Sequence, residues 1–306
     1  MPVVENADAV RVRVPAKVNL HLSVGAVRPD GFHELTTVFQ AVALFDDVIA
    51  RAAAGLGVTA DGTFAAGVPT DHTNLAFGAA ELLAAHAGAD PDVLLELHKA
   101  IPVAGGMAGG SADAAGALVA CAALWRTGTQ RAELAELAAL LGSDVPFALF
   151  GGTALGVGRG EQLTPVLSTG EYHWVLALSD TGLATAEVYR ELDRLRDTGA
   201  AAEPAGPPDE LLDALRAGDC GRAADALAND LQPAALSLRP ELAEVLAAGA
   251  ELGALGGVVS GSGPTCAFLC AHADAASDLA DELDRAGVCA ATRVATAPAP
   301  GARITG

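Results

Sequence analysis

The chain has 306 residues, of which 51% are hydrophobic, and its 38 acidic residues outnumber 18 basic ones to give a formal net charge of −20. This composition is typical of a folded globular protein, and so acidic a surface disfavours binding to nucleic acid or to anionic membranes. Five scattered cysteines with no Cys-x-x-Cys pair predict neither a disulfide framework nor a zinc site. Any phosphorylated ligand would require the few cationic side chains to gather around it.

The first residues, Met-Pro-Val-Val-Glu-Asn-Ala-Asp, lack the basic start and apolar run of a signal peptide. Gly, Pro or a charge interrupts each apolar stretch before it reaches the length of a membrane span. We therefore expect a cytoplasmic protein.

Hydrophobic patterning predicts a chain that mixes strands and helices. Strands are expected over residues 10–14, 18–24, 38–49, 93–97, 174–178, 266–270 and 288–297. Helices are expected over residues 74–87, 111–124, 132–141, 211–227 and 240–252. Pro15 should break the first strand, residues 28–33 should form a turn, and Gly142 should end its helix in the left-handed conformation. With no regular β-α-β rhythm and no fixed-period repeat, the pattern indicates an α+β fold of two subdomains that divide near residues 155–170.

Lysine is rare in this chain: sixteen of the eighteen basic residues are arginine, and only Lys17 and Lys99 are lysine. A lysine that persists against such a bias indicates a need for a compact ammonium group whose pKa can shift. This marks Lys17 as a candidate functional residue.

A glycine-rich segment, Ile-Pro-Val-Ala-Gly-Gly-Met-Ala-Gly-Gly-Ser-Ala-Asp-Ala-Ala, occupies residues 101–115. Backbone without side chains can approach a ligand closely and direct several N–H groups at one anion, and the dipole of the following helix adds to this attraction. Ser111 follows the last glycine where a Walker A loop has lysine, and the spacing does not fit G-x-G-x-x-G. Taken alone, the segment is equally compatible with a glycine-rich turn capped by serine.

This segment resembles the nucleotide-binding motif of the GHMP kinases (galactokinase, homoserine, mevalonate and phosphomevalonate kinases). Three further segments follow the order found in one group of that family, and the similarity spans residues 10–297. They are residues 15–20 with 28–35, residues 142–147 with 151–152 and 158–161, and residues 260–265. The resemblance implies ATP-dependent phosphorylation of a small alcohol that carries a cytidine diphosphate group, in the non-mevalonate route to isoprenoid precursors.

The resemblance also implies the two-subdomain α+β GHMP kinase fold. Residues 1–160 would form an N-terminal domain like domain 2 of ribosomal protein S5, with the ATP loop and the catalytic residues. Residues 161–306 would form a ferredoxin-like domain that contributes to the substrate pocket.

By the same resemblance, ATP binds at one continuous loop. Its residues are Pro102, Val103, Ala104, Gly105, Gly106, Met107, Ala108, Gly109, Gly110, Ser111 and Ala112. Mg²⁺ should accompany the nucleotide and bridge its phosphate oxygens. No carboxylate cluster with ligand spacing predicts a metal site made by the protein. The chain departs from the common motif at residues 107–108 and 112–113, and we expect the carboxylate of Asp113 to point away from the phosphates.

Asp144 matches the family's general base, which accepts the proton of the attacking hydroxyl group. Without the resemblance, Asp144 before Val-Pro would be interpreted as a helix N-cap. Lys17 matches the family's catalytic lysine and would stabilise the developing alkoxide. Asn19 should face the same side of the strand as Lys17 and contact the substrate.

The cytosine site implied by the resemblance uses His33 for edge hydrogen bonds and Phe32, which replaces the usual tyrosine, for stacking. Tyr189 would supply the opposite aromatic face, with Thr185 one helical turn before it. The glycine-rich turn at residues 260–265 would shape the substrate pocket. Two alternatives remain: another GHMP kinase, such as a homoserine or mevalonate kinase, and a nucleotide-binding module without catalytic activity.

Overall fold

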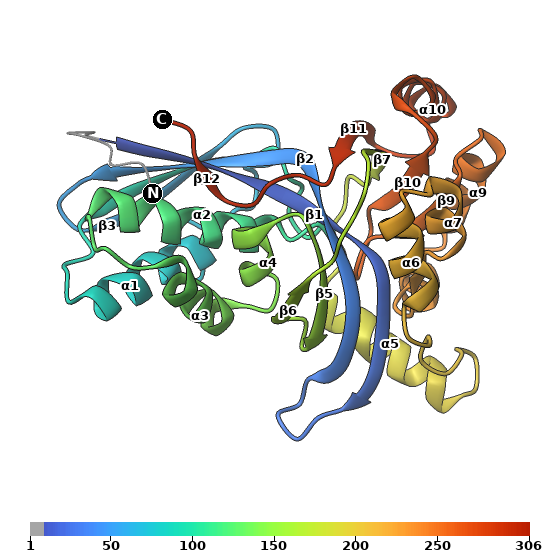
Figure 1. Ribbon diagram of the computed structural model, residues 1–306, viewed down its shortest axis with the longest axis horizontal. Coiled ribbons are helices and arrows are strands. Elements are labelled where there is room, and N and C mark those ends of the chain that lie inside the picture. The colour runs from blue at the N-terminus through green and yellow to red at the C-terminus, as the bar shows by residue number, and fades with distance from the viewer. Residues whose placement is uncertain (1–8) are drawn as a thin grey trace.

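The computed structural model describes residues 9–306, so the expectation that the first residues form no signal peptide lies outside the described part. Within this part the chain forms an eight-stranded sheet and a four-stranded sheet, each covered by helices (Figure 1). Trp174 joins the two sheets, because its indole Nε1 donates a hydrogen bond of 2.9 Å to the side-chain oxygen of Gln40 in the first sheet.

The first sheet is built on a long antiparallel hairpin, which runs down the view in Figure 1. Five of its strands lie side by side in the order β12-β1-β2-β4-β3. Three more strands are attached to these: β5 pairs with β2, β6 pairs with β5, and β8 pairs with β1. Its members are β1 (Ala9–Val27), β2 (His33–Ala52), β3 (Leu56–Asp61), β4 (Val93–His98), β5 (Thr153–Gly158), β6 (Gln162–Pro165), β8 (Ala228–Asn229) and β12 (Arg303–Ile304).

Pro15 does not break the first strand, so the prediction of two separate strands was wrong. The pairing shifts between Pro15, opposite Phe45, and Ala16, opposite Val42. Such a β-bulge tolerates proline, since the residue need not donate to the ladder there, and β1 continues through it. Lys17 and Asn19 therefore lie on one uninterrupted strand, between the bulge and the hairpin tip.

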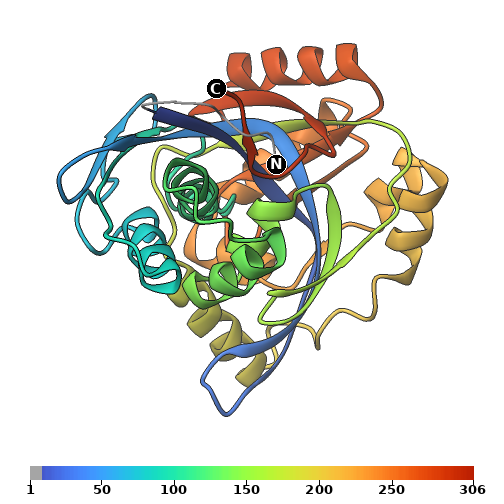
Figure 2. The same ribbon diagram turned by 60° about the vertical axis from the view of Figure 1, so that its left-hand side comes forward.

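Three helices pack on this sheet, namely α1 (Leu75–Ala87), α2 (Gly109–Leu124) and α4 (Val145–Phe150), and α3 (Arg131–Leu141) packs against all three. The central one is α2, which Figure 2 shows enclosed by the sheet and its neighbours. Its small residues allow close approach: a Cβ added to Gly116 would lie 2.6 Å from Val48. The middle of α2 therefore packs closely against β2.

Gly142 ends α3 in an extended conformation, with φ of 173°, so the predicted left-handed terminator was wrong. Its N–H still donates to the carbonyl of Ala138, and the chain continues directly into the short turn that begins α4. The start of α4 is where Asp144 lies.

The second sheet is antiparallel and has the strand order β11-β7-β10-β9. If its four strands are numbered 1 to 4 along the chain, this order is 4-1-3-2, as in ferredoxin-like folds. Its strands are β7 (Tyr172–Leu178), β9 (Gly256–Val259), β10 (Cys266–Cys270) and β11 (Ala291–Ala297). The accompanying helices are α5 (Thr185–Asp197), α6 (Asp209–Ala217), α7 (Cys220–Asp225), α8 (Gln232–Leu238), α9 (Glu241–Glu251) and α10 (Ala273–Ala286). The helix predicted over residues 211–227 is two helices, because Gly218 adopts a left-handed φ of 70° between them.

The chain passes from the first sheet to the second between Pro165 and Tyr172, while β8 and β12 return to the first sheet. The division at residue 160 therefore stays a prediction. Across residues 9–306, no helix combines the length and the apolar character that crossing a membrane requires.

Candidate active site

A cavity of about 870 Å³ opens between the β1–β2 hairpin, the loop before α2, and α5. Every predicted catalytic and substrate-binding residue lines it, together with much of the predicted nucleotide loop. These residues are Lys17, Asn19, Phe32, His33, Asp144, Thr185 and Tyr189, with Ala104, Gly105, Gly106, Ala108, Gly109, Gly110 and Ser111 from the loop. Residues far apart in the sequence thus meet in one place.

The other four predicted loop residues do not line the cavity. Met107 and Ala112 are fully buried in the core, and Pro102 is also buried, whereas Val103 is exposed to solvent. The carbonyl of Met107 accepts a hydrogen bond of 3.3 Å from the backbone N–H of Lys17. The three buried residues therefore anchor the loop to the fold, and Met107 ties it to the strand that carries Lys17.

The loop has an unusual backbone. Ala104 and Ala108 both adopt positive φ, of 51° and 60°, which side-chain-bearing residues rarely do. Gly106 has φ of 77°, and a Cβ there would lie 2.1 Å from the carbonyl oxygen of Ser260. Strained backbone of this kind persists where the surroundings enforce it, and it is commonly found at ligand sites.

The turn at residues 260–265 braces this loop from the C-terminal half of the chain. The Ser260 hydroxyl donates to the carbonyl of Gly106 at 3.1 Å, and the N–H of Thr265 lies 3.4 Å from the carbonyl of Gly105. The loop's conformation consequently depends on a segment more than a hundred residues further along the chain.

The loop ends at the first turn of α2, which begins at Gly109. Ala108, Gly109, Gly110 and Ser111 line the cavity there. The first N–H groups of a helix have no partner within it, and the helix dipole places partial positive charge at this end. The loop and α2 together form a cradle suited to an anion such as a phosphate group.

Lys17 and Asp144 form an ion pair inside the cavity, with 3.7 Å between Nζ and a carboxylate oxygen. Lys17 Nζ also donates to Asn19 Oδ1 at 2.5 Å, and the Asn19 amide donates to Thr37 Oγ1 at 2.8 Å. Asn19 therefore faces the same side as Lys17, as predicted. Burial lowers the pKa of Lys17 from its usual value, and the nearby Asp144 carboxylate partly opposes this effect.

Asp144 stands at the N-cap position of α4, but its side chain makes no capping hydrogen bond to that helix. The carboxylate is 30% exposed and is directed to Lys17 instead. The alternative interpretation of Asp144 as a capping residue therefore fails on geometry.

Aromatic residues gather at the other side of the cavity. The rings of His33 and Tyr189 lie 5.0 Å apart at an angle of 31°, and His33 Nε2 is 2.9 Å from a carboxylate oxygen of Asp193. Burial raises the pKa of Tyr189, so its hydroxyl stays neutral. Phe32 is 52% exposed, and its ring is covered by the guanidinium of Arg159 at 4.9 Å.

Sequence reasoning missed Arg159 and Arg190, which also line the cavity and add positive charge to it. With Lys17 they gather cations at this site in an otherwise acidic chain, as a phosphorylated ligand requires. Arg159 could have been found from its place between two glycines in the segment at residues 158–161. Arg190 directly follows Tyr189, a position with no distinguishing local signal.

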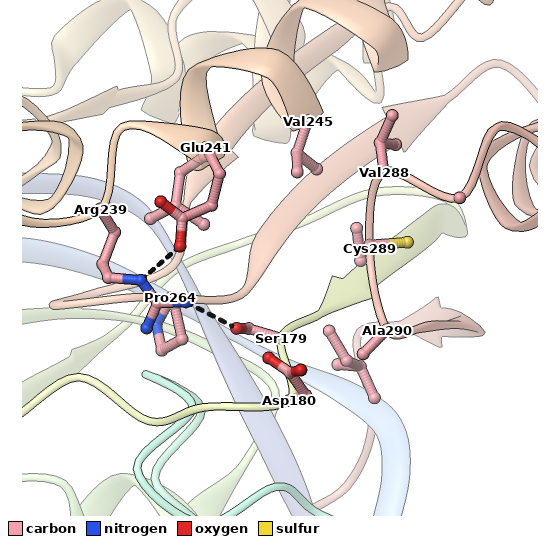
Figure 3. A pocket seen from close by; sticks show the side chains of 13 residues that line it. Ser179, Asp180, Arg239, Glu241, Val245, Pro264, Val288, Cys289 and Ala290 are labelled. Atoms are coloured by element: carbon pink, nitrogen blue, oxygen red, sulfur yellow. Dashed lines mark hydrogen bonds and ion pairs between the residues drawn. The ribbon is translucent and has the colours of Figure 1, made fainter.

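A second cavity of about 270 Å³ lies in the C-terminal half (Figure 3). Arg239 points across it, and its guanidinium is bonded to Glu241 and to the hydroxyl of Ser179. None of the predicted catalytic, nucleotide-binding or substrate-binding residues lines this cavity, although Pro264 of the turn at residues 260–265 borders it. Its main cationic group already has partners, so the larger cavity is the candidate active site.

Comparison with known proteins places this geometry in a family. Residues 74–152 match the GHMP kinases N terminal domain, and residues 211–289 match the GHMP kinases C terminal domain. The 4-diphosphocytidyl-2-C-methyl-D-erythritol kinase of Rhodococcus jostii is 59% identical over 295 residues, which cover 96% of this chain and 94% of that protein. The enzyme of the same name from Mycobacterium tuberculosis is 58% identical over 97% of this chain and 93% of its own.

Solved structures agree. A crystal structure of 4-(cytidine 5'-diphospho)-2C-methyl-D-erythritol kinase superposes with a TM-score of 0.76 at 34% identity, covering 94% of this chain and 99% of that one. A homoserine kinase from Cytophaga hutchinsonii has the same TM-score at 18% identity over the full length of both chains, and shows likeness of fold alone. The predicted fold is confirmed.

Proposed function

The chain belongs to the GHMP kinase family, and from this membership we propose that it transfers the γ-phosphoryl group of ATP to the 2-hydroxyl of 4-diphosphocytidyl-2-C-methyl-D-erythritol. It is a kinase that acts on a small molecule. The reaction yields ADP and the 2-phosphate and serves isoprenoid precursor synthesis. The observation that carries the choice of substrate is one cavity that holds both a Lys–Asp pair and an aromatic–histidine cluster.

The nucleotide phosphates bind at the loop and the first turn of α2. Backbone N–H groups of Gly109 and Gly110 are available there, and glycine at position 106 leaves room for the brace from Ser260. These features fit a triphosphate through hydrogen bonding and the helix dipole. The loop thereby holds the terminal phosphate beside the Lys17–Asp144 pair.

Mg²⁺ accompanies the nucleotide and neutralises charge on its phosphate oxygens. The described residues contain no group of three or more His, Cys, Asp or Glu side chains arranged to hold a metal ion. The Ser111 hydroxyl, which lines the cavity at the start of α2, is the side chain placed to approach a nucleotide-bound ion.

Asp144 accepts the proton of the substrate hydroxyl as its oxygen attacks the γ-phosphorus. Lys17 stabilises the negative charge that develops on that oxygen. Asn19 holds the ammonium in place through its side-chain oxygen, since its amide is in turn fixed by Thr37. The pair is therefore oriented before the substrate arrives.

The cytosine base binds beside Phe32, His33 and Tyr189. Asp193 fixes the imidazole of His33 through Nε2, which leaves the other ring nitrogen for the edge of the base. Thr185, whose hydroxyl lies 3.0 Å from that of Ser262, joins α5 to the turn that braces the loop. The substrates of homoserine and mevalonate kinases carry no nucleobase and would leave this cluster unused.

The experiment that tests the proposal supplies purified protein with ATP, Mg²⁺ and one of three alcohols, and measures ADP release. We expect turnover with 4-diphosphocytidyl-2-C-methyl-D-erythritol, and the phosphorus NMR spectrum should show one new phosphomonoester. Turnover with homoserine or mevalonate in its place would identify another GHMP activity. Nucleotide binding without turnover of any alcohol would favour a non-catalytic module.

A further inference from the structure

Lys99, the second of the chain's two lysines, is buried beneath the nucleotide loop. It follows β4 directly, and its side chain is 1% exposed. Its ammonium donates to carboxylates of Asp46 and Asp113, the latter at 2.5 Å, and approaches the carbonyl of Gly109 at 3.3 Å. Both carboxylates are as deeply buried as the ammonium itself.

This cluster links three elements that meet below the cavity. Asp46 belongs to β2, and its second oxygen accepts the backbone N–H groups of Ala100 and Ile101, at 2.6 and 2.9 Å. These residues lead into the nucleotide loop. Asp113 and Gly109 belong to the first turns of α2, where the loop ends. The cluster therefore holds both ends of the loop.

Removing three charged groups from water is costly, and a buried ion pair is poor evidence of a stabilising role. Apolar residues of similar size could pack β2 against α2, as Val48 and Gly116 do nearby. Directional bonds add something that apolar packing does not: they fix the distance between the two ends of the loop to within hydrogen-bonding tolerance. The Gly109 carbonyl is the contact through which the ammonium fixes the start of α2.

We propose that Lys99 is a positioning residue, which with Asp46 and Asp113 holds the two ends of the nucleotide loop at the separation that a triphosphate requires. Lys99 does not line the cavity, so it acts through the loop and not through contact with a ligand. The inference rests on the proposed role of the loop in binding ATP, but not on the identity of the alcohol.

The test compares Lys99→Met with Val48→Ala, a control that loosens the same packed region without touching the cluster. Steady-state rates are measured against ATP and against the alcohol separately, at a temperature where both variants are folded. We expect Lys99→Met to raise KM for ATP by about tenfold or more, because a displaced loop would lose hydrogen bonds to the charged phosphates. KM for the alcohol should stay within about twofold, and Val48→Ala should change neither constant by more than that. Equal effects of the two variants on KM for ATP would overturn the proposal.

Two further variants keep the test decisive if Lys99→Met does not fold. Asp113→Asn retains an oxygen acceptor of the same shape, whereas Asp113→Leu removes it. Calorimetry with the non-hydrolysable analogue AMP-PNP should show affinity within about threefold of the parent for Asp113→Asn and a loss of about tenfold or more for Asp113→Leu. Equal affinity in both variants would contradict the positioning role. Because this readout needs no turnover, it remains valid even if the parent protein phosphorylates none of the alcohols and the proposed function fails.

Discussion

Lys17 and Asp144 face one another across the cavity, with Nζ and a carboxylate oxygen 3.7 Å apart. The lysine lies in the middle of β1 and the aspartate at the start of α4, so the helices under the sheet set the distance between them. At this separation a hydroxyl oxygen can approach both groups. The pair is the part of the site on which the proposed phosphoryl transfer depends.

The first prediction is that Lys17→Met and Asp144→Asn each lower kcat by about 10²–10⁴-fold, since one removes the charge that stabilises the alkoxide and the other removes the base. Affinity for AMP-PNP should change by less than about threefold, because the proposed nucleotide contacts lie in the loop. Single-turnover rates and calorimetry measure the two quantities. Near-normal turnover in both variants would refute the mechanism.

The second prediction concerns Gly106, where an added Cβ would meet the carbonyl oxygen of Ser260 at 2.1 Å. Gly106→Ala should lower the free energy of unfolding by roughly 2–4 kcal/mol and raise KM for ATP, because the loop must shift away from its brace. Gly128→Ala is the matched control: its φ of 74° is equally unfavourable, but no atom lies within 4 Å of the added methyl group. Urea denaturation should show a loss of only about 1 kcal/mol there.

Comparable losses in the two alanine variants would mean that backbone strain, and not the contact with Ser260, accounts for the effect at Gly106.

The third prediction separates the base site from the phosphate site. Tyr189→Ala should raise KM for the cytidine-bearing alcohol by about tenfold or more, because the aromatic ring beside His33 is lost. Tyr189→Phe keeps the ring and should stay within about twofold. KM for ATP should be unchanged in both. If Tyr189→Ala weakened ATP and alcohol equally, the residue would support the fold and not the base.

The fourth prediction is a pH dependence of stability. Burial raises the pKa of Asp113 to about 7, with Asp46 adding to the rise and Lys99 opposing it. The folded protein therefore binds this proton more tightly than the unfolded chain, so the free energy of unfolding falls as pH rises from about 4 to about 7. Asp113→Asn has no such proton to lose.

We therefore compare the free energy of unfolding of Asp113→Asn with that of the parent. The variant's value relative to the parent should be roughly 1–4 kcal/mol higher at pH 8 than at pH 5. Urea denaturation at the two pH values measures the difference. The same pH dependence in parent and variant would show that Asp113 does not titrate in this range.

The local parts of the site were predictable from sequence. The glycine-rich segment, the helix after it and the turn at residues 28–33 are each specified by neighbouring residues, because glycine and proline act on their own backbone. The continuity of β1 through Pro15 was not predictable in this way, since the bulge is defined by pairing with β2. The apolar spacing of Leu279 and Leu283 in α10 could have predicted that helix, which the sequence interpretation omitted.

Contacts between distant segments account for what was missed in the site. Nothing near Arg159 in the sequence indicates that it covers Phe32, because the two residues belong to different strand ends. Lys99 offered one signal, its rarity as a lysine in an arginine-rich chain. That signal marked Lys17 and Lys99 equally, and only the structure separates the residue in the cavity from the one beneath the loop.

The brace between Ser260 and Gly106 has a consequence for the order of events during synthesis. The loop leaves the ribosome long before the turn that supports it, so a nascent chain that ends before residue 260 carries the loop without its partner. The nucleotide pocket is then completed only when most of the polypeptide has emerged. We therefore expect ATP to stabilise nearly finished molecules more than nascent chains that end before residue 260.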